Sequence, residues 1–253
     1  MFIEYGELST RLYDLTKPVG FSINGDLEYY YQYLEQLTGT ILEAGVGTGR
    51  LMIPYLEKGL DIEGVDLSSA MLAQCEKNMA LHHVKGTLYQ GDLTKLALKK
   101  RYEAIIMPTG SLCLIPNHLI LDILTSFYEH LEASGTLIVD LELPTWFNEQ
   151  EVSISNYPLT DTEGLLFTST AQNMDWHQQK VSYVHRYELV SNGQVTQTEL
   201  SHFTLYWYGI QEFISLLEKA GFTSVTYEAG YGKNTQDSLI TFFATKPDNS
   251  TVN

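Results

Sequence analysis

The stretch ILEAGVGTGR, residues 41–50, decides the fold of this chain. An apolar run enters a turn with glycine at every second position, Gly45, Gly47 and Gly49, and a helical pattern follows to about Lys58. Glycine tolerates positive φ and lets a ligand approach the backbone closely, and the free N–H groups of a helix start favour an anionic group. The stretch predicts a strand, a turn and a helix that together hold a ligand, with a simple tight turn as the alternative.

Apolar strand-like segments and helical patterns alternate from residue 40 to 142, which is typical of a parallel sheet covered by helices. We expect strands at 40–44, 61–66, 86–90, 102–107 and 135–141, and helices at 68–81 and 117–131. Ser68 or Ser69 is the expected N-cap of the first of these helices. A helix at 211–220, closed by Gly221, and strands at 223–228 and 239–246 complete this predicted core, and residues 1–35 read as a helical, aromatic cap.

Residues 145–208 have a different, antiparallel pattern. The pair Asn192-Gly193 is a strong hairpin signal between strands at 181–191 and 194–206, and 165–173 adds a third strand. We therefore expect residues 1–144 and 209–247 to form one core with an N-terminal helical cap. Residues 145–208 form an antiparallel β insertion, expected to be a substrate lid.

A two-residue turn at Asn192-Gly193 predicts the register of that hairpin. Continued without a break, it places Arg186 opposite Glu199, Tyr183 opposite His202 and His185 opposite Leu200. One face then carries Tyr183, His185, Tyr187, Leu200, His202 and Tyr206. We expect this face to form the wall of a pocket, although both faces mix polar and apolar groups and this face could instead pack on the chain's own helices.

Composition narrows the classes of partner. The net charge is −16, from 15 basic and 31 acidic residues, and such a field repels phosphate backbones, so nucleic acid is not the expected substrate. No apolar run reaches the roughly 18 residues that a membrane span needs, and residues 1–5 lack the pattern of a secretion signal. The two cysteines, Cys75 and Cys113, lie in apolar segments without metal-ligand spacing, which favours reduced thiols and a cytoplasmic location.

Two common nucleotide motifs do not fit the glycine turn. A nicotinamide-binding fingerprint has the spacing G-x-G-x-x-G, and here the third glycine comes one residue too early. A phosphate-binding loop of the Walker type needs Gly-Lys followed by Ser or Thr, where this chain has Gly49-Arg50-Leu51. Both alternatives are therefore disfavoured.

The turn instead resembles the nucleotide motif of the class I, Rossmann-like S-adenosylmethionine-dependent methyltransferases of small molecules. Their pattern E/D-x-G-x-G-x-G is matched from Glu43 to Gly49. Asp66 closes the second strand, where the family's carboxylate meets the ribose, and Gln90–Leu93 resembles the stretch whose acid meets the adenine amino group. The resemblance implies S-adenosylmethionine as cofactor and a doubly wound α/β fold whose mostly parallel seven-stranded sheet has the order 3-2-1-4-5-7-6.

The same resemblance assigns further positions. Tyr13 looks like a tyrosine that reaches the methionine end of the cofactor, and Met71 looks like the apolar residue under the adenine, although a surface tyrosine and a core methionine are the simpler alternatives. The residues expected to bind the cofactor are Tyr13, Glu43, Gly45, Val46, Gly47, Gly49, Arg50, Asp66, Leu67, Met71, Gly91, Asp92, Leu93, Pro108 and Thr109. Pro108 and Thr109 follow the fourth strand, at the point where open α/β sheets bind ligands.

Methyl transfer is a displacement in which the cofactor carries the activation and the protein supplies alignment. The expected reaction is transfer to an N or O atom of a small molecule, and a protein that binds the cofactor without turnover is the alternative. A base is compatible with this chemistry. We select His202, because residues 199–206 resemble the lid segment of small-molecule members, including sugar-amine N-methyltransferases; a packed sheet histidine is the alternative. Asp175, His177 and His185 have poor metal-ligand spacing, so no metal is expected.

Overall fold

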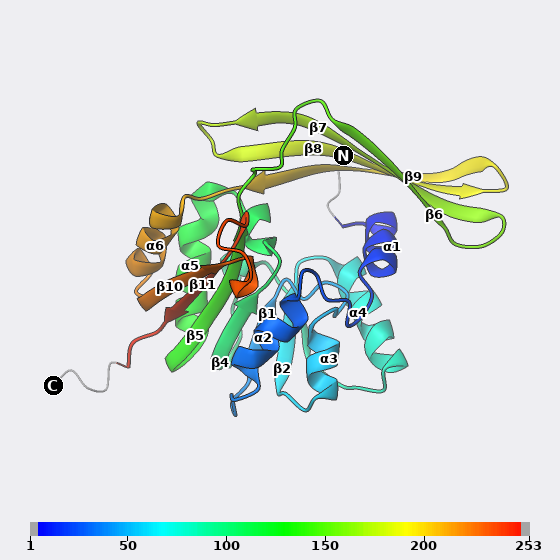
Figure 1. Ribbon diagram of the computed structural model, residues 1–253. Helices are drawn as coiled ribbons and strands as arrows, with labels where there is room; N and C mark the ends of the chain where they lie inside the picture. The colour runs from blue at the N-terminus through cyan, green and yellow to red at the C-terminus, as the bar shows by residue number, and fades with distance from the viewer. Residues whose placement is uncertain (1–4, 249–253) are drawn as a thin grey trace.

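A computed structural model describes residues 5–248 and contains a seven-stranded sheet with an antiparallel four-stranded sheet above it (Figure 1). The order of the main sheet is β10-β11-β5-β4-β1-β2-β3. Its strands are β1 (Ile41–Ala44), β2 (Ile62–Asp66), β3 (Leu88–Gln90), β4 (Tyr102–Met107), β5 (Leu131–Glu142), β10 (Thr223–Ala229) and β11 (Leu239–Thr245). Strand β11 runs antiparallel to both β5 and β10, and the other pairings are parallel. The predicted fold class and strand order are confirmed.

Helices cover both faces of this sheet, except for the first helix, which packs under the second sheet. They are α1 (Glu7–Thr16), α2 (Asp26–Leu34), α3 (Met52–Glu57), α4 (Ser69–Leu81), α5 (Ile120–His130) and α6 (Ile210–Lys219). One core joins α5 and α6 to the sheet, and a second core packs α2, α3 and α4 on the sheet. Ser68 is the N-cap of α4, because its hydroxyl accepts a hydrogen bond from the amide of Met71 at 3.2 Å.

The second sheet, which we call the lid sheet, consists of β6 (Val152–Pro158), β7 (Glu163–Asp175), β8 (Lys180–Ser191) and β9 (Gln194–Tyr206) in this order. Its strands follow β5 in the chain and extend over one end of the main sheet (Figure 1). The predicted hairpin is present, but the sequence analysis missed β6. Val152 and Ile154 alternate with serines, so the sequence does contain a strand signal here, but the run is short and both apolar side chains are exposed in the structure.

The predicted register of the hairpin is wrong beyond its first pairs. Ser191 lies opposite Gln194 and Val190 opposite Val195, but Leu189 then pairs with Gln197. Thr196 is therefore the extra residue of a β-bulge, and its hydroxyl donates to the carbonyl of Leu189 at 3.1 Å.

The bulge moves every later pair by one residue. Arg186 faces Leu200 rather than Glu199, Tyr183 faces Phe203 rather than His202, and His185 faces Ser201 rather than Leu200. Because side chains alternate along a strand, a one-residue shift turns each residue of β9 to the other face. Glu199, Ser201 and Phe203 thus share the face of Tyr183, His185 and Tyr187, which we call the inner face.

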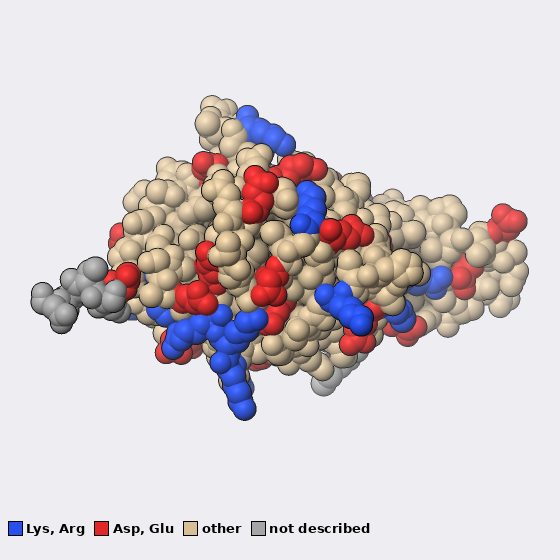
Figure 2. Space-filling view, turned by 90° about the horizontal axis from the view of Figure 1, so that it is seen from below, with Lys and Arg blue, Asp and Glu red and all other residues tan. Residues whose placement is uncertain are grey.

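No helix within residues 5–248 combines the length and the apolar character that crossing a membrane requires. Figure 2 views the molecule from the side opposite the lid sheet. Lys and Arg side chains lie there among Asp and Glu, so this face is electrostatically mixed. In the same range, no cluster of three or more His, Cys, Asp or Glu side chains could hold a metal ion.

A buried carboxylate joins the loop after β4 to the C-terminal strands. Asp140 on β5 has no exposed surface and accepts hydrogen bonds from the Thr109 amide at 2.6 Å, the Thr241 hydroxyl at 2.7 Å and the Tyr231 hydroxyl at 2.9 Å. Burial raises the pKa of Asp140 to about 6, although these hydrogen bonds act in the opposite direction. The loop at Thr109, where φ is 55°, is therefore hydrogen-bonded to the carboxyl group of Asp140, which titrates near pH 6.

This raised pKa predicts a specific pH dependence of stability. The unfolded chain loses this proton near pH 3.8, whereas the folded protein keeps it up to about pH 6. The contribution to stability is therefore present at low pH and is lost as the pH rises through 6. From pH 5 to pH 7.5, the free energy of unfolding of the wild type should fall by about 1 kcal/mol relative to that of Asp140→Asn. Parallel urea titrations measure this difference, and identical pH slopes for both proteins would contradict it.

Candidate active site

The main cavity lies at the carboxyl ends of β1, β2 and β4, and its volume is about 660 Å³. Gly45 and Gly47 of the turn after β1, Asp66 at the end of β2 and Met107 at the end of β4 all line it. This is the position where open parallel sheets bind ligands, because the loops after neighbouring strands diverge there. The cavity is large enough for a nucleotide-sized ligand.

The turn is shaped to admit a ligand against its backbone. Gly47 has a φ of 56°, and a Cβ atom added there would meet no other atom within 4 Å. A larger residue would be strained by this φ, and its side chain would extend into the space beside the turn. Gly49 has a different role, because a Cβ atom there would lie 2.8 Å from both Cys75 and Ile53. Gly47 therefore leaves room for a ligand, whereas Gly49 allows α3 and α4 to pack closely against the turn.

Asp66 connects two of the loops around the cavity. Its Oδ2 accepts a hydrogen bond from the Gly47 amide at 2.9 Å, and its Oδ1 accepts one from the Ser68 amide at 2.8 Å. Burial raises the pKa of Asp66, while the backbone hydrogen bonds to Ser68 and Gly47 lower it. The carboxylate is thus held in a fixed orientation at the cavity wall.

The structure separates the predicted cofactor residues into two groups. Those that line the cavity are Tyr13, Gly45, Gly47, Asp66, Leu67, Met71, Asp92 and Leu93. Those that do not line it are Glu43, Val46, Gly49, Arg50, Gly91, Pro108 and Thr109. The second group mostly supports the first. Val46, for example, packs against Gly64, where a Cβ atom would lie 2.7 Å away from the valine side chain.

Glu43 and Arg50 belong to a buried charged cluster behind the turn. Arg50 donates to the Asp26 carboxylate at 2.6 Å and to the carbonyl of Phe21 at 2.8 Å, and both charged side chains are almost fully buried. Burial raises the pKa of Glu43 to about 8, with the nearby Arg50 acting in the opposite direction. This cluster fastens the segment around residues 21–26 to the glycine turn, so it sets the position of the turn rather than the wall of the cavity.

Several cavity residues were missed by the sequence analysis. They are Tyr5, Gly6, Ser68, Ser69, Ala70, Thr94, Met107, Ser111, Leu114, Ile115, Pro116, Leu119 and Ile123. Met107 and Ser111 flank the predicted pair Pro108 and Thr109, so the loop was identified but not its exposed positions. Ser68, Ser69, Ala70 and Thr94 directly adjoin the predicted Leu67, Met71 and Leu93. The others come from the N-terminal segment and from residues 114–123, which no local motif marks as a binding site.

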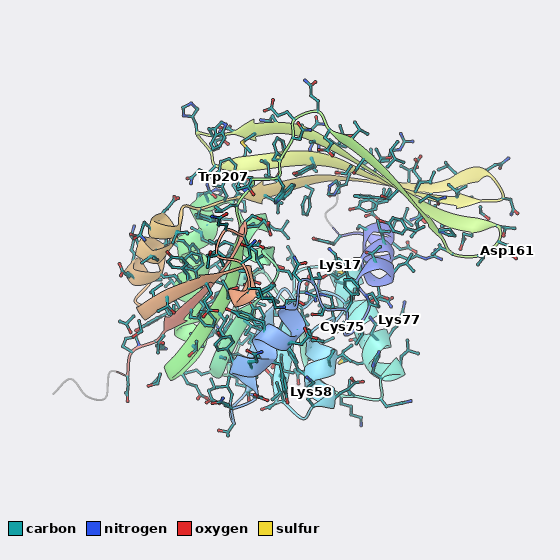
Figure 3. All side chains as sticks on the ribbon, in the orientation of Figure 1. Lys17, Lys58, Cys75, Lys77, Asp161 and Trp207 are labelled. Atoms are coloured by element: carbon teal, nitrogen blue, oxygen red, sulfur yellow. The ribbon has the colours of Figure 1, made fainter. Side chains whose placement is uncertain are left out.

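A second cavity of about 360 Å³ lies between α1 and the inner face of the lid sheet. The residues that line it are Tyr5, Ser9, Leu12, Tyr13, Thr16, Lys17, Tyr157, Phe167, His185, Tyr187, Ser201 and Phe203. Tyr5 and Tyr13 line both cavities, so these two rings form a shared wall. Lys17 lies beside α1 and beneath the lid sheet (Figure 3), with its ammonium 4.8 Å from the centre of the Tyr13 ring.

The histidine of the lid sheet that reaches this cavity is His185, not His202. The ring of His185 stacks on Phe203 with 4.7 Å between centroids, and its Nδ1 lies 3.4 Å from the Tyr187 hydroxyl. Burial lowers the pKa of His185 to about 4, so the imidazole is neutral at pH 7. His202 is exposed and pairs with Val184 on the outer face, so the prediction that His202 and Tyr183 point together into the pocket is wrong.

Known proteins resemble this chain in sequence and in fold. Residues 41–135 match the family described as "Methyltransferase domain". A protein of Geobacillus sp. (strain WCH70) with the name "Putative methyltransferase" is 29% identical over 111 residues, a match that spans 44% of this chain and 45% of that relative. The chain thus matches less than half the length of this curated relative.

Solved structures match over almost the whole chain. The sugar N-methyltransferase KedS8 from Streptoalloteichus sp ATCC 53650 has a TM-score of 0.78 at 16% identity, covering 98% of this chain and 96% of its own. The CcbJ methyltransferase from Streptomyces caelestis has a TM-score of 0.75 at 22% identity, with coverage of 96% and 98%. CalS10, an amino pentose methyltransferase from Micromonospora echinaspora solved with S-adenosylmethionine bound, has a TM-score of 0.70 at 15% identity, with coverage of 97% and 99%. Residues 41–135 therefore resemble a methyltransferase domain, and the chain has the Rossmann-like fold of these S-adenosylmethionine-dependent methyltransferases.

Proposed function

We propose that this protein transfers the methyl group of S-adenosylmethionine to an N or O atom of a small molecule. The observation that carries the proposal is the pair of adjacent cavities. One lies at the glycine turn, the other lies under the lid sheet, and Tyr5 and Tyr13 line both. A donor in the first and an acceptor in the second would meet near these two rings, which is the arrangement that a displacement reaction needs.

The residues of the main cavity fit S-adenosylmethionine. The open space at Gly47 accommodates a ligand against the turn, and Asp66 offers a carboxylate at the end of β2 for the ribose hydroxyls. Met71 and Leu93 provide apolar surface for the adenine, and Asp92, which also lines the cavity, is the candidate partner of its amino group. When bound, the cofactor supplies the electrophilic methyl group, and the chain supplies orientation and a cavity wall.

The second cavity suits a small acceptor with some apolar surface. Its aromatic walls, including Tyr157, Phe167 and Phe203, exclude water from the approach to the donor. The neutral imidazole of His185 and the hydroxyls of Tyr187 and Ser201 offer hydrogen bonds to a polar acceptor. We assign His185 the task of orienting the acceptor, because its low pKa makes it a weak base.

The expected class of acceptor follows from charge and size. The chain carries a net charge of −16, which disfavours phosphate backbones as substrates. A cavity of about 360 Å³ has the volume of a metabolite site rather than of a polymer groove. Both cysteines are buried free thiols, which supports the proposal of a reducing, cytoplasmic location.

The remaining alternative is a protein that binds S-adenosylmethionine without turnover. Incubation with cofactor labelled in the methyl group and a pool of small metabolites distinguishes the two. Label in a metabolite, together with release of S-adenosylhomocysteine, supports the enzyme. Tight binding of the cofactor with no transfer to any metabolite would favour the binding protein, and no binding at all would contradict both.

The carboxylate of Asp66 should contribute directly to cofactor affinity. Asp66→Ala removes the acceptor of the ribose hydroxyls and the hydrogen bond to Gly47, so S-adenosylmethionine binding should weaken by about 1–3 kcal/mol. Gly47→Val, which fills the space beside the turn, should abolish binding. Isothermal titration calorimetry measures both effects. Unchanged affinity in the two variants would contradict the assignment of this cavity.

The two histidines of the lid sheet provide a matched pair for testing the acceptor site. His185→Ala should lower methyl transfer by roughly tenfold or more, because it removes a hydrogen-bonding group beside the acceptor. His202→Ala, on the outer face, should leave transfer near the wild-type rate. Affinity for S-adenosylhomocysteine should be the same in all three proteins. The reverse order of activities would return the catalytic role to His202.

A further inference from the structure

A side chain of the lid sheet caps the first helix of the chain. The Glu199 carboxylate accepts hydrogen bonds from the Leu8 amide at 2.8 Å, the Ser9 amide at 3.2 Å and the Ser9 hydroxyl at 2.5 Å. These amides belong to the first turn of α1, whose N–H groups have no partner within the helix. A negative charge at this end also interacts favourably with the helix dipole. The usual role of an N-cap residue is therefore performed by a residue more than 180 positions away in the chain.

The local sequence leaves this position to Glu199. The N-cap residue of α1 is Gly6, which has no side chain to cap the helix. A Cβ atom at Gly6 would lie 2.6 Å from Oε2 of Glu199, so the glycine is needed for the carboxylate to come so close. The bulge at Thr196 turns Glu199 to the inner face, because the unbroken register would pair it with Arg186. Gly6 and the bulge at Thr196 are thus both needed for the contact between Glu199 and the start of α1.

The opposite side of α1 is hydrogen-bonded to α4, which lines the main cavity, the one assigned to the cofactor. Asp14 accepts hydrogen bonds from Asn78 at 2.7 Å and from Gln74 at 3.1 Å, both on α4. The carbonyl of Tyr5 accepts one from the hydroxyl of Ser68, the N-cap of α4, at 2.9 Å. Helix α1 therefore bridges the lid sheet on one side and the helix after the Asp66 loop on the other.

The bridge contains the wall that the two cavities share. Tyr5, Gly6 and Tyr13 line the cofactor cavity, and Tyr5, Ser9, Tyr13 and Lys17 line the cavity under the lid sheet. Leu8 and Leu12 also pack with Leu165 and Tyr187 of the lid sheet. A displacement of α1 away from the lid sheet would move residues of both cavities at once.

We propose that Glu199 is a positioning residue that latches α1 to the lid sheet, and that this latch controls escape of the cofactor and couples the two cavities. With the latch closed, α1 holds Tyr13 and the preceding Tyr5 beside the point where donor and acceptor meet. Opening the latch frees the N-terminal side of the cofactor cavity. The proposal rests on the assignment of S-adenosylmethionine to the main cavity.

The first test compares Glu199→Ala with wild type and with Glu163→Gln. Glu163 is the matched control, since it also joins the lid sheet to α1, through an exposed ion pair with Arg11 at 3.2 Å. Exposed ion pairs contribute little to stability. Glu163→Gln should therefore release S-adenosylhomocysteine at the wild-type rate. In Glu199→Ala, S-adenosylhomocysteine should dissociate roughly tenfold faster in stopped-flow measurements, as expected for loss of a charged cap. Glu199→Gln, which keeps the size of the side chain, provides a milder version of the same change.

Hydrogen exchange on the protein without cofactor tests the latch independently. In Glu199→Ala, amides of α1 and amides of β9 around residues 197–203 should lose protection together, because each element holds the other. Loss of protection in α1 alone would identify Glu199 as a helix cap without a coupling role and would overturn the proposal.

A double variant separates helix stability from the latch. Gly6→Ser in the Glu199→Ala background supplies a local N-cap, and the φ of −79° at Gly6 accepts a serine. This variant should regain the thermal stability of the wild type, while the amides of β9 around residues 197–203 stay unprotected. Recovery of their protection, or unchanged dissociation of S-adenosylhomocysteine in Glu199→Ala, would overturn the proposal. If wild type fails to bind S-adenosylhomocysteine, the cofactor assignment is wrong, and the exchange experiment alone decides the latch.

Discussion

The hydrogen bond between the Gly47 amide and the Asp66 carboxylate is the contact on which the site depends. It joins the loops after two neighbouring parallel strands, β1 and β2, at the edge of the sheet where their carboxyl ends meet. The same carboxylate also holds the Ser68 amide at the start of α4. One side chain therefore sets the separation of the glycine turn, the second loop and the helix that follows, and these three elements line the main cavity.

Buried charge supports this arrangement from behind. The ion pair of Arg50 and Asp26 fixes the N-terminal segment against the turn, and Asp140 holds the loop after β4 by accepting the Thr109 amide. Charged groups are costly to bury unless they are paired or hydrogen-bonded. Here each of these carboxylates fastens a loop or chain segment that lacks regular secondary structure. The apolar cores stabilise the sheet and helices, whereas these polar contacts determine where the connecting segments lie.

The sequence was sufficient to predict the main sheet but not the details of the lid sheet. Strands β1, β4 and β5 are largely buried, and their apolar runs with intervening helices indicate a parallel sheet, whose strand order the family resemblance supplied. Gly47, Asp66 and Asp92 were found because the motifs that resemble those of the methyltransferases lie at the ends of strands. Strand β6 was missed although Val152 and Ile154 alternate with serines, because this apolar–polar run is short. Tyr5 and Ile115 were missed as cavity residues because tertiary packing alone brings them to the cavity.

The bulge at Thr196 shows why a functional face is harder to predict than a fold. Hairpin strands, turn and alternation were all correct near Asn192-Gly193, yet one inserted residue exchanged the faces of β9. Compared with the predicted register, His202 and Leu200 lie on the outer face, while Ser201 and Phe203 line the cavity under the lid sheet. The unbroken register would pair Arg186 with the oppositely charged Glu199, but each side chain has another partner. Arg186 pairs with Glu188 at 2.6 Å, and Glu199 caps α1. A pair of opposite charges in the sequence is therefore weak evidence for a strand register when a helix N-terminus can bind the same carboxylate.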